Sequence, residues 1–247
     1  MAATPPPQAP PSPPPPEPSG GGGGKPPRVA CLVCLVCAVV VATAAVALRP
    51  VQQQNQVLDR QVNILMAAGM YQPGMDVQAA FKTIERKFVK LDTGEYVDEP
   101  DSYDHLKAAK DPARSKEAAP NAAKVRRVPT VGLVFQVRSS AGAVEAIIIP
   151  IEGMGLWSTL YGYLALGPDT RTIKGITFYE HGETPGLGGE VDNARWKSRW
   201  KGRLAFDERW VPSIGVVTGM AVPGDDEPHL QHVVSGAGLA QRRCART

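Results

Sequence analysis

The sequence predicts an α+β protein in which one N-terminal transmembrane helix precedes a mixed, largely antiparallel sheet domain with helices. The first observation behind this prediction is Val29–Leu48, a run of 20 residues without charge. A helix of that length spans roughly 30 Å, the thickness of the hydrocarbon core of a bilayer. The second observation is that three later segments are rich in β-branched residues and two of them follow each other closely. Neighbouring strands with short connections favour an antiparallel sheet.

The chain before the apolar run has a different composition. Residues 1–28 are rich in proline, glycine and serine and carry almost no apolar side chains, so burial cannot offset the entropy of ordering them. We therefore expect residues 1–28 to be a disordered tail and residues 29–48 to be a retained membrane anchor. The competing interpretation is a cleavable signal peptide, with Ala45–Ala47 as the cleavage site, but such peptides have apolar cores of only ~7–15 residues.

Helical spacing continues beyond the anchor. Residues spaced three and four apart predict that the helix continues out of the membrane and that one of its faces packs on its own domain or on a partner subunit. Gly69 is predicted to end this helix. Asp76 is predicted to cap a further helix. The stripe consists of Leu48, Val51, Asn55, Leu58, Val62 and Leu65, and the apolar face of the capped helix would be Val77, Phe81, Ile84 and Phe88.

Three segments read as strands. Val131–Arg138, Val144–Glu152 and Ile173–Glu180 are rich in β-branched residues. The first two are separated by Ser139–Gly142, which suits a hairpin turn. These strands would form the core of a soluble domain.

Composition and spacing exclude several functions. The net charge is only +3, and no cluster of basic residues is interleaved with aromatic ones, which argues against a nucleic-acid partner. Cys31, Cys34 and Cys37 lie inside the apolar run without a nearby histidine or carboxylate, so they are better explained as small packing residues than as metal ligands. No nucleophile with a nearby base is visible. Hydrolase and metalloenzyme functions are therefore disfavoured.

Two segments are candidates for ligand binding. Glu180–Glu190 holds four glycines after a predicted strand, and such a loop either presents backbone N–H groups to a ligand or is a wide surface loop. Gly153–Leu166 carries Trp157, Ser158 and Thr159. The indole could stack on a planar ring while the hydroxyls bond its polar edge, or the aromatic and aliphatic residues of this segment could simply be core.

Both segments carry a family resemblance. From about Leu35 to Gly236 the chain resembles the NqrC family, the membrane-anchored flavoprotein subunits of the sodium-translocating NADH:quinone reductases. The most specific motifs are "GLWSTLYGYLAL" and "HGETPGLGGEVDNARWKSRWKG", supported by "LDRQVNILMAAG" and "FVKLDTGEYVD". The flavin subunit of Rnf-type complexes shares the short flavin motif but resembles the "EVDNARW" region less well.

The resemblance implies an FMN-binding domain over residues 49–240, placed outside the cytoplasm of a bacterial inner membrane that the chain crosses once. It implies FMN as the cofactor, held in the family through a phosphoester to a threonine. It assigns no catalytic residue and no metal ligand. The positions it assigns to the cofactor are Trp157, Ser158, Thr159, Gly182, Glu183, Thr184, Leu187, Gly188, Ser235, Gly236, Ala237 and Gly238.

The attachment signature departs from the family pattern. Ser235, Gly236 and Ala237 match, but the family's threonine falls on Gly238, which has no hydroxyl to form a phosphoester. The family's acid falls on His232 and its second hydroxyl on Ala240. We interpret this departure, with an atypical tail at residues 241–247, as a shifted reading frame; true divergence is the alternative. Covalent attachment of FMN is accordingly doubtful.

The expected function is therefore electron transfer through FMN within a membrane sodium-pumping NADH:quinone oxidoreductase. The expected partners are the other subunits of that complex and membrane lipid, without direct binding of NADH and without catalysis by the isolated chain. The alternatives are a non-flavinylated structural subunit or truncated product of the same complex, and the flavin subunit of an Rnf-type complex.

Overall fold

A computed structural model describes residues 25–121, 123–212, 214–218 and 230–233, with side chains for residues 28–121, 123–212 and 214. Most of the N-terminal tail, and the segment that contains Ser235, Gly236, Ala237 and Gly238, lie outside the described residues. The chain divides into two compact units, Met1–Gln52 and Gln53–Thr247.

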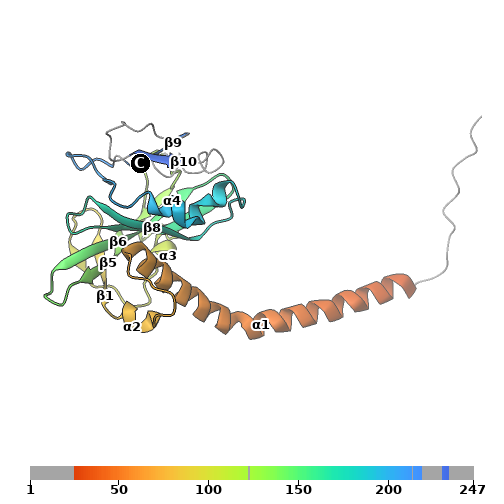
Figure 1. Ribbon diagram of the computed structural model, residues 1–247. Helices are drawn as coiled ribbons and strands as arrows, with labels where there is room; N and C mark the ends of the chain where they lie inside the picture. The colour runs from red at the N-terminus through yellow and green to blue at the C-terminus, as the bar shows by residue number, and fades with distance from the viewer. Residues whose placement is uncertain (1–24, 122, 213, 219–229, 234–247) are drawn as a thin grey trace, which may run out of the picture. The chain divides into compact units, whose positions relative to one another are not determined.

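The first helix, α1, runs from Lys25 to Ala68 (Figure 1). By length and composition, its segment Arg28–Ala68 could cross a membrane. The predicted anchor, residues 29–48, lies inside this helix, and its apolar side chains are exposed. Its hydroxyl at Thr43 donates to the carbonyl of Val39 at 2.7 Å, which satisfies that polar group within the helix itself.

The end of α1 is set by Gly69. Its φ of +73° is the left-handed conformation that glycine adopts without steric cost. Its N–H donates to Met66 O at 3.1 Å, and the N–H of Met70 donates to Leu65 O at 2.9 Å. This pair of bonds is a Schellman motif, so the predicted stop is confirmed. In the predicted stripe Leu65 is fully buried, whereas Leu58 and Val51 are 41% and 50% exposed.

The predicted helix after Asp76 is much shorter than expected. The Asp76 carboxylate does cap it, accepting from Gln78 N at 3.0 Å and Ala79 N at 3.1 Å, but α2 comprises only Val77–Phe81. The remainder of the expected apolar face, Ile84 and Phe88, lies in strand β1 (Ile84–Lys90). A spacing of four residues places side chains on one face of a strand as well as of a helix, so this spacing could not distinguish the two.

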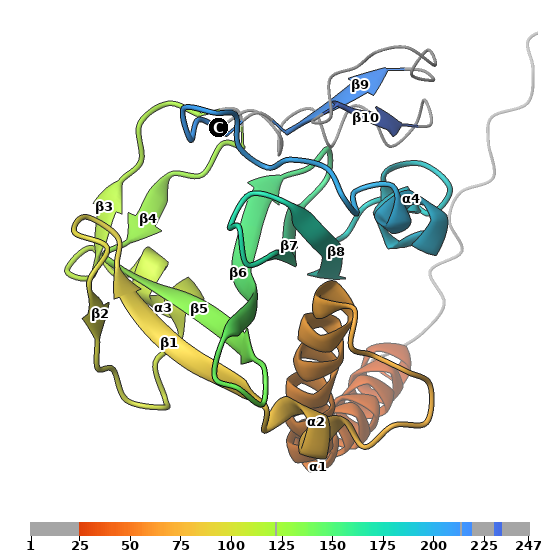
Figure 2. The same ribbon diagram turned by 60° about the vertical axis from the view of Figure 1, so that its left-hand side comes forward.

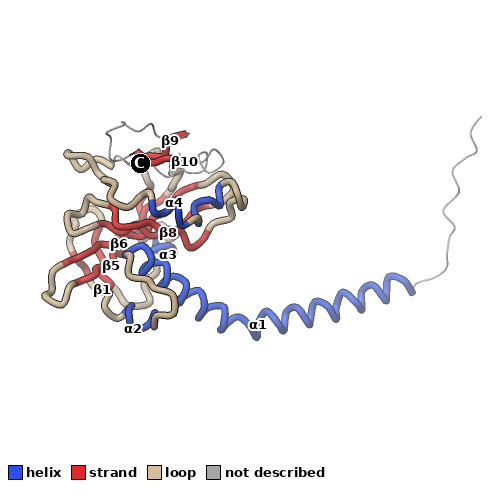
Figure 3. Tube along the Cα trace, in the orientation of Figure 1, coloured by secondary structure: helices blue, strands red, loops and turns tan. Residues whose placement is uncertain are grey.

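Six strands form one sheet in the order β2-β1-β5-β6-β7-β8 (Figure 2), and every neighbouring pair is antiparallel. Figure 3 shows the strands in red. The predicted antiparallel α+β domain is confirmed. Strands β5 and β8 coincide with the predicted segments, and the Ser139–Gly142 turn joins β5 to β6. Strand β7 follows β6 directly along the chain. The bounds not yet given are β2 Tyr96–Val97, β5 Val131–Arg138, β6 Val144–Met154, β7 Thr159–Leu166 and β8 Ile173–Glu180.

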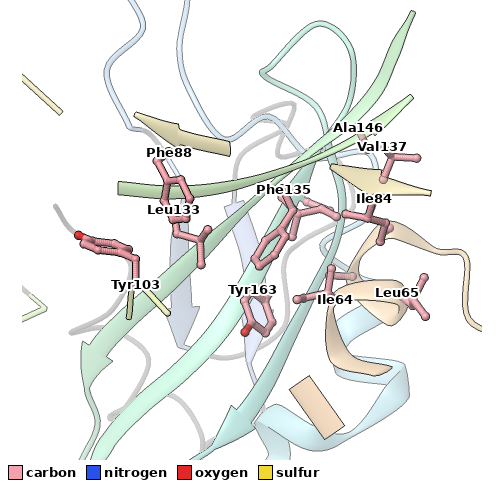
Figure 4. Packing of buried hydrophobic residues seen from close by; sticks show 14 of the residues in the cluster. Ile64, Leu65, Ile84, Phe88, Tyr103, Leu133, Phe135, Val137, Ala146 and Tyr163 are labelled. Carbon is pink, nitrogen blue, oxygen red and sulfur yellow. The ribbon is translucent and has the colours of Figure 1, made fainter. Parts of the chain in front are cut away.

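The sheet is covered on both faces. Successive side chains of a strand point to opposite faces, and along β7 Tyr163 and Ala165 belong to one buried cluster while Leu164 and Leu166 belong to another. The first cluster joins the sheet to Ile64 and the other buried residues at the end of α1 (Figure 4). The second cluster joins the opposite face to the tryptophans of the region around α4.

The remaining elements surround the sheet (Figure 2). Helix α4 follows the loop after β8, and Asn193 caps it by accepting from Arg195 N at 2.9 Å. Strands β9 and β10 pair in parallel. The bounds are α3 His105–Lys110, β3 Ser115–Glu117, β4 Arg127–Pro129, η1 Gly188–Asp192, α4 Ala194–Ser198, β9 Gly215–Thr218 and β10 Leu230–Val233.

Candidate functional site: a cradle between a hairpin turn and a glycine-rich loop

The first part of the site is the tight turn between β6 and β7, residues 155–158. Gly155 N donates to Ser158 O at 2.7 Å, which closes the turn. The turn lifts Trp157 out of the sheet, and 70% of this residue is exposed. The interpretation of Trp157 as a core residue is therefore wrong, whereas Leu160 and Leu164 of the same segment are core.

The second part is the loop after β8, residues 181–189. The carbonyl of Thr184 accepts from Leu187 N at 3.1 Å and from Gly189 N at 3.0 Å, which folds the loop back on itself before η1 begins at Gly188. Gly186 has a φ of +76°, a conformation that a side chain would strain. The glycine density therefore serves a compact, internally bonded loop rather than a wide one.

The two parts are joined by a reciprocal pair of contacts. Glu183 Oε1 accepts from the backbone N–H of Trp157 at 3.0 Å and of Ser158 at 3.2 Å. In return, Ser158 Oγ accepts from the backbone N–H of Gly182 at 2.6 Å. Each segment thus binds the backbone of the other, and we call the resulting arrangement the cradle: the 155–158 turn, the 181–189 loop and these contacts.

Burial makes the Glu183 carboxylate unusual. The residue is only 6% exposed, and among the described residues no group pairs with its Oε2 atom. Burying a carboxylate is costly unless hydrogen bonds compensate it. The hydrogen bonds that Oε1 accepts therefore have to offset the burial of the whole group.

Two glycines leave room for this carboxylate. A Cβ atom added at Gly188 would lie 2.5 Å from Glu183 Oε2, and one added at Gly155 would collide with Glu183 Oε1. Real Cβ atoms do not approach other atoms so closely. The backbone of both segments can therefore wrap the carboxylate only because neither position carries a side chain.

His181 supports the loop from its other side. Its Nε2 atom lies 2.8 Å from Asp192 Oδ2, and its Nδ1 atom accepts from Glu183 N at 3.3 Å. An acceptor at Nδ1 requires the proton on Nε2, which then donates to the carboxylate of Asp192. The imidazole thus links the start of the loop to the end of η1.

Most of the predicted site residues meet in the cradle, but not all. Trp157, Ser158, Gly182 and Glu183 form it, and Thr184, Leu187 and Gly188 belong to its loop. Thr159 begins β7, and its hydroxyl lies 3.8 Å from Met154 Sδ. The four predicted positions from Ser235 to Gly238 lie outside the described residues.

Sequence reasoning missed two residues of the cradle, Gly155 and His181, and one residue that supports it, Asp192. Gly155 stands two positions before Trp157, and this Gly-x-Trp spacing is a signal that was available. The pairing of His181 with Asp192 had no such signal, because Asp192 lies eleven positions further along the chain, at the end of η1.

Two hollows lie elsewhere on the domain, with volumes of about 560 and 550 Å³. Both are lined by Val125, Glu152 and Tyr161, and the second also by Thr159. Burial raises the pKa of the Glu152 carboxyl above its ordinary value, although Lys110 opposes the shift. Neither hollow is lined by Trp157 or Glu183. The bonding pattern, rather than hollow volume, therefore marks the cradle as the candidate site.

Comparisons with known proteins agree with this choice. A protein-family model described as an FMN-binding domain matches residues 155–242, which begin at the first residue of the turn and include the whole loop. The NqrC subunit of the Na(+)-translocating NADH-quinone reductase of Pseudomonas aeruginosa is 46% identical over 223 residues, which cover 87% of this chain and 85% of that protein. The corresponding subunit of Yersinia pestis is 43% identical and covers 80% of this chain and 76% of that protein.

The chain belongs to the NqrC family of Na(+)-translocating NADH-quinone reductase subunits. The crystal structure of Shewanella oneidensis NqrC agrees, with a TM-score of 0.67 and 35% sequence identity over 73% of this chain and 84% of that one. The resemblance drawn from the sequence is thus confirmed. The antiparallel sheet domain after an apolar helix is the fold of this NqrC family member.

Proposed function

We propose that this NqrC family protein binds FMN in the cradle and transfers electrons through it within a membrane Na(+)-translocating NADH-quinone reductase. One observation carries the proposal. The buried Glu183 carboxylate, with one oxygen unpaired, joins two segments that both fall inside the match to the FMN-binding domain. The names of the relatives support the rest, since they are subunits of that reductase.

The residues present fit a flavin. The exposed indole of Trp157 offers a face on which a planar ring can stack. Thr184, Leu187 and Gly188 present hydroxyl, apolar and backbone groups from the folded loop, and the buried Glu183 carboxylate fixes the turn beside them. When bound, FMN supplies the redox chemistry. The chain supplies the orientation of the ring and the charge around it.

Attachment is proposed to be noncovalent in this chain. A phosphoester requires a hydroxyl oxygen, and Gly238 has none at the position where the family signature carries its threonine. His232 and Ala240 also replace the acid and the second hydroxyl of that signature. The cradle, in contrast, retains its glycines and Glu183. Binding then depends on the contacts that the cradle makes.

The intact mass of the purified chain, coexpressed with a flavin-attaching transferase, tests this part of the proposal. We expect no mass increase for the chain as it stands, and an increase of one FMN less water for the triple variant His232→Asp, Gly238→Thr and Ala240→Thr. The single variant Gly238→Thr is the matched control, because it restores the hydroxyl without its neighbours. An FMN adduct on the unaltered chain would contradict the proposal.

The surroundings of the flavin are also part of the proposal. The long apolar helix α1 supports a single-pass anchor in a bacterial inner membrane, with lipid and the other subunits of the reductase as partners. The flavin domain is proposed to lie on the extracytoplasmic side. NADH is proposed to bind to another subunit, so that this chain receives electrons only through the complex.

A structural role without flavin is the second candidate. The observation that favours it is again Gly238, since the family's attachment residue is absent. Such a subunit would hold the complex together through α1 and its domain. Binding of free FMN to the cradle distinguishes the two functions, because only the electron-transfer subunit requires it.

A further inference from the structure

We propose that Glu183 is a positioning residue that assembles the cradle before any ligand binds. Its Oε1 atom holds the 155–158 turn in a fixed place against the 181–189 loop, so that Trp157 is already presented when FMN arrives. The consequence for FMN rests on the proposed function. The assembly itself does not, because it concerns only contacts within the protein.

The geometry carries the first step. Trp157 and Ser158 are consecutive residues, and both of their N–H groups point at one oxygen, at 3.0 and 3.2 Å. The acceptor comes from 26 residues further along the chain, so the contact is tertiary and not part of the turn. Within the turn itself, the structure closes the backbone only through Gly155 N and Ser158 O. Glu183 therefore decides where the exposed turn lies relative to the loop.

The return contact makes the arrangement a two-way link. Ser158 Oγ accepts from Gly182 N at 2.6 Å, next in sequence to Glu183. Three hydrogen bonds thus join two residues of the turn to two of the loop. Removal of either side chain deletes a different part of the link, so the two parts can be tested separately.

Burial adds to the strength of the link. Glu183 is 6% exposed, so water competes little for Oε1. Bonds between backbone N–H groups and an ionised acceptor are stronger than neutral ones. The Oε2 atom is buried and lies against the backbone of Gly188, where an added Cβ would be 2.5 Å away. One oxygen of the carboxylate thus holds the turn while the other packs inside the loop.

Amide hydrogen exchange of the full chain in detergent, without FMN, tests the proposal. In Glu183→Ala we expect the amides of Trp157 and Ser158 to exchange at least about tenfold faster, because each loses its charged acceptor. In Ser158→Ala only the amide of Gly182 should become faster by a similar factor. The sheet amides of Leu164 and Ile176 should keep their rates, which distinguishes local release from unfolding.

Two further variants separate positioning from charge. Glu183→Gln keeps an oxygen that can accept from the turn but removes the charge, so exchange at Trp157 and Ser158 should accelerate less than in Glu183→Ala. Glu180→Ala removes an exposed acid at the end of β8 and is the matched control, with no expected change. Unchanged exchange at Trp157 and Ser158 in Glu183→Ala, or equal acceleration in Glu183→Gln, would overturn the proposal.

FMN titration of the same proteins tests the consequence. Quenching of flavin fluorescence should report at least about tenfold weaker binding of FMN by Glu183→Ala. In that variant the turn and the loop must be ordered when FMN binds, and this ordering reduces the binding free energy by about 1.4 kcal/mol or more. If the unaltered chain does not bind FMN at all, the proposed function fails, but the exchange rates still decide whether Glu183 assembles the cradle. If FMN binds equally well to both, the link has no role in binding and that consequence is wrong.

Discussion

At the residue scale, the cradle depends on two glycines, Gly155 and Gly188, as much as on the side chain of Glu183. Gly155 and Gly188 let the backbone of two segments approach the Glu183 carboxylate more closely than any Cβ atom would permit. Glycine is the residue that allows such an approach. The same loop contains Gly186, whose role is conformational instead, because an added Cβ there would meet nothing within 4 Å while its φ is +76°.

Gly188→Ala should therefore damage the cradle more than Gly186→Ala. The methyl group at 188 would lie 2.5 Å from Glu183 Oε2 and must displace the carboxylate. We expect a loss of about 1–3 kcal/mol in the free energy of unfolding, typical of overpacking, together with loss of FMN affinity. At 186 only backbone strain of roughly 1 kcal/mol is expected, with FMN affinity kept. Thermal unfolding and FMN titration measure both effects; equal loss of affinity in the two variants would contradict this account.

The residues of this site could be predicted in part. Glycine density after a strand, and an aromatic with two hydroxyls, mark both segments without knowledge of any contact. That Glu183 reaches back to the turn could not be predicted, because the contact spans 26 residues and needs the β7–β8 pairing to bring the segments together. The lack of a hydrogen-bond partner for Oε2 likewise depends on tertiary packing, which the spacing of residues along the sequence does not predict.

At the element scale, the end of α1 is fitted closely to β8, the strand that leads into the loop (Figure 2). Thr177 Oγ1 donates to Asn63 O at 3.1 Å, and both residues are buried. The Arg60 guanidinium lies 5.4 Å from the centre of the Tyr179 ring. Gly175 approaches the Ala67 carbonyl so closely that an added Cβ would lie 2.5 Å from it. Alternate residues of β8 thus meet successive turns of α1.

Variants of β8 test this fit. Thr177→Val keeps the side-chain shape but deletes the hydrogen bond to Asn63, so we expect a loss of about 0.5–1.5 kcal/mol in the free energy of unfolding. Gly175→Ala should cost about 1–3 kcal/mol through overpacking. Thr83→Val is the control, because its hydroxyl bonds only locally and is exposed; a change within about 0.5 kcal/mol is expected. Urea unfolding of the detergent-solubilised chain measures all three, and a Thr177→Val variant as stable as the unaltered chain would refute the contribution of this bond.

Three of the strands were predictable because β-branched runs recur between turns, whereas β2, β3, β4 and β7 were not predicted. Strands β5 and β8 match the predicted segments, and β6 extends two residues further than expected. The helix after Asp76 was predicted too long, because Ile84 and Phe88 satisfy strand and helix periods alike. Pairing with β5 decides between them: the whole of β1 forms a ladder with it, from Ile84 opposite Val137 to Lys90 opposite Val131. Tertiary pairing of this kind overrides local spacing.

At the scale of the whole molecule, the two ends of α1 differ in burial. Its segment 29–48 exposes apolar side chains throughout, whereas Ile64, Leu65 and Ala67 are buried in the core of the domain. An exposed apolar surface of that length is unfavourable in water and suits lipid. The apolar segment 29–48 and these buried residues thus belong to one helix, Lys25–Ala68.

The protein should consequently stay with membranes that are washed in alkaline carbonate. Such washing removes peripheral proteins, while a helix with 20 uncharged residues remains inserted. Antibody detection in the pellet and supernatant measures the outcome. A variant that carries Val33→Lys and Val40→Asp within the run is the control and should be released, because each buried charge opposes insertion by about 3 kcal/mol. Release of the unaltered chain, or a mature N-terminus near Leu48, would contradict the retained anchor.

The central claim is that FMN binds in the cradle between the β6–β7 turn and the loop after β8, and amide chemical-shift mapping tests it most directly. The full chain, labelled with ¹⁵N in detergent micelles, would be titrated with FMN. We predict the largest shifts at the amides of Trp157, Ser158, Gly182 and Thr184, with little change at Val125, which lines both hollows. Shifts confined to the linings of those hollows would contradict the account.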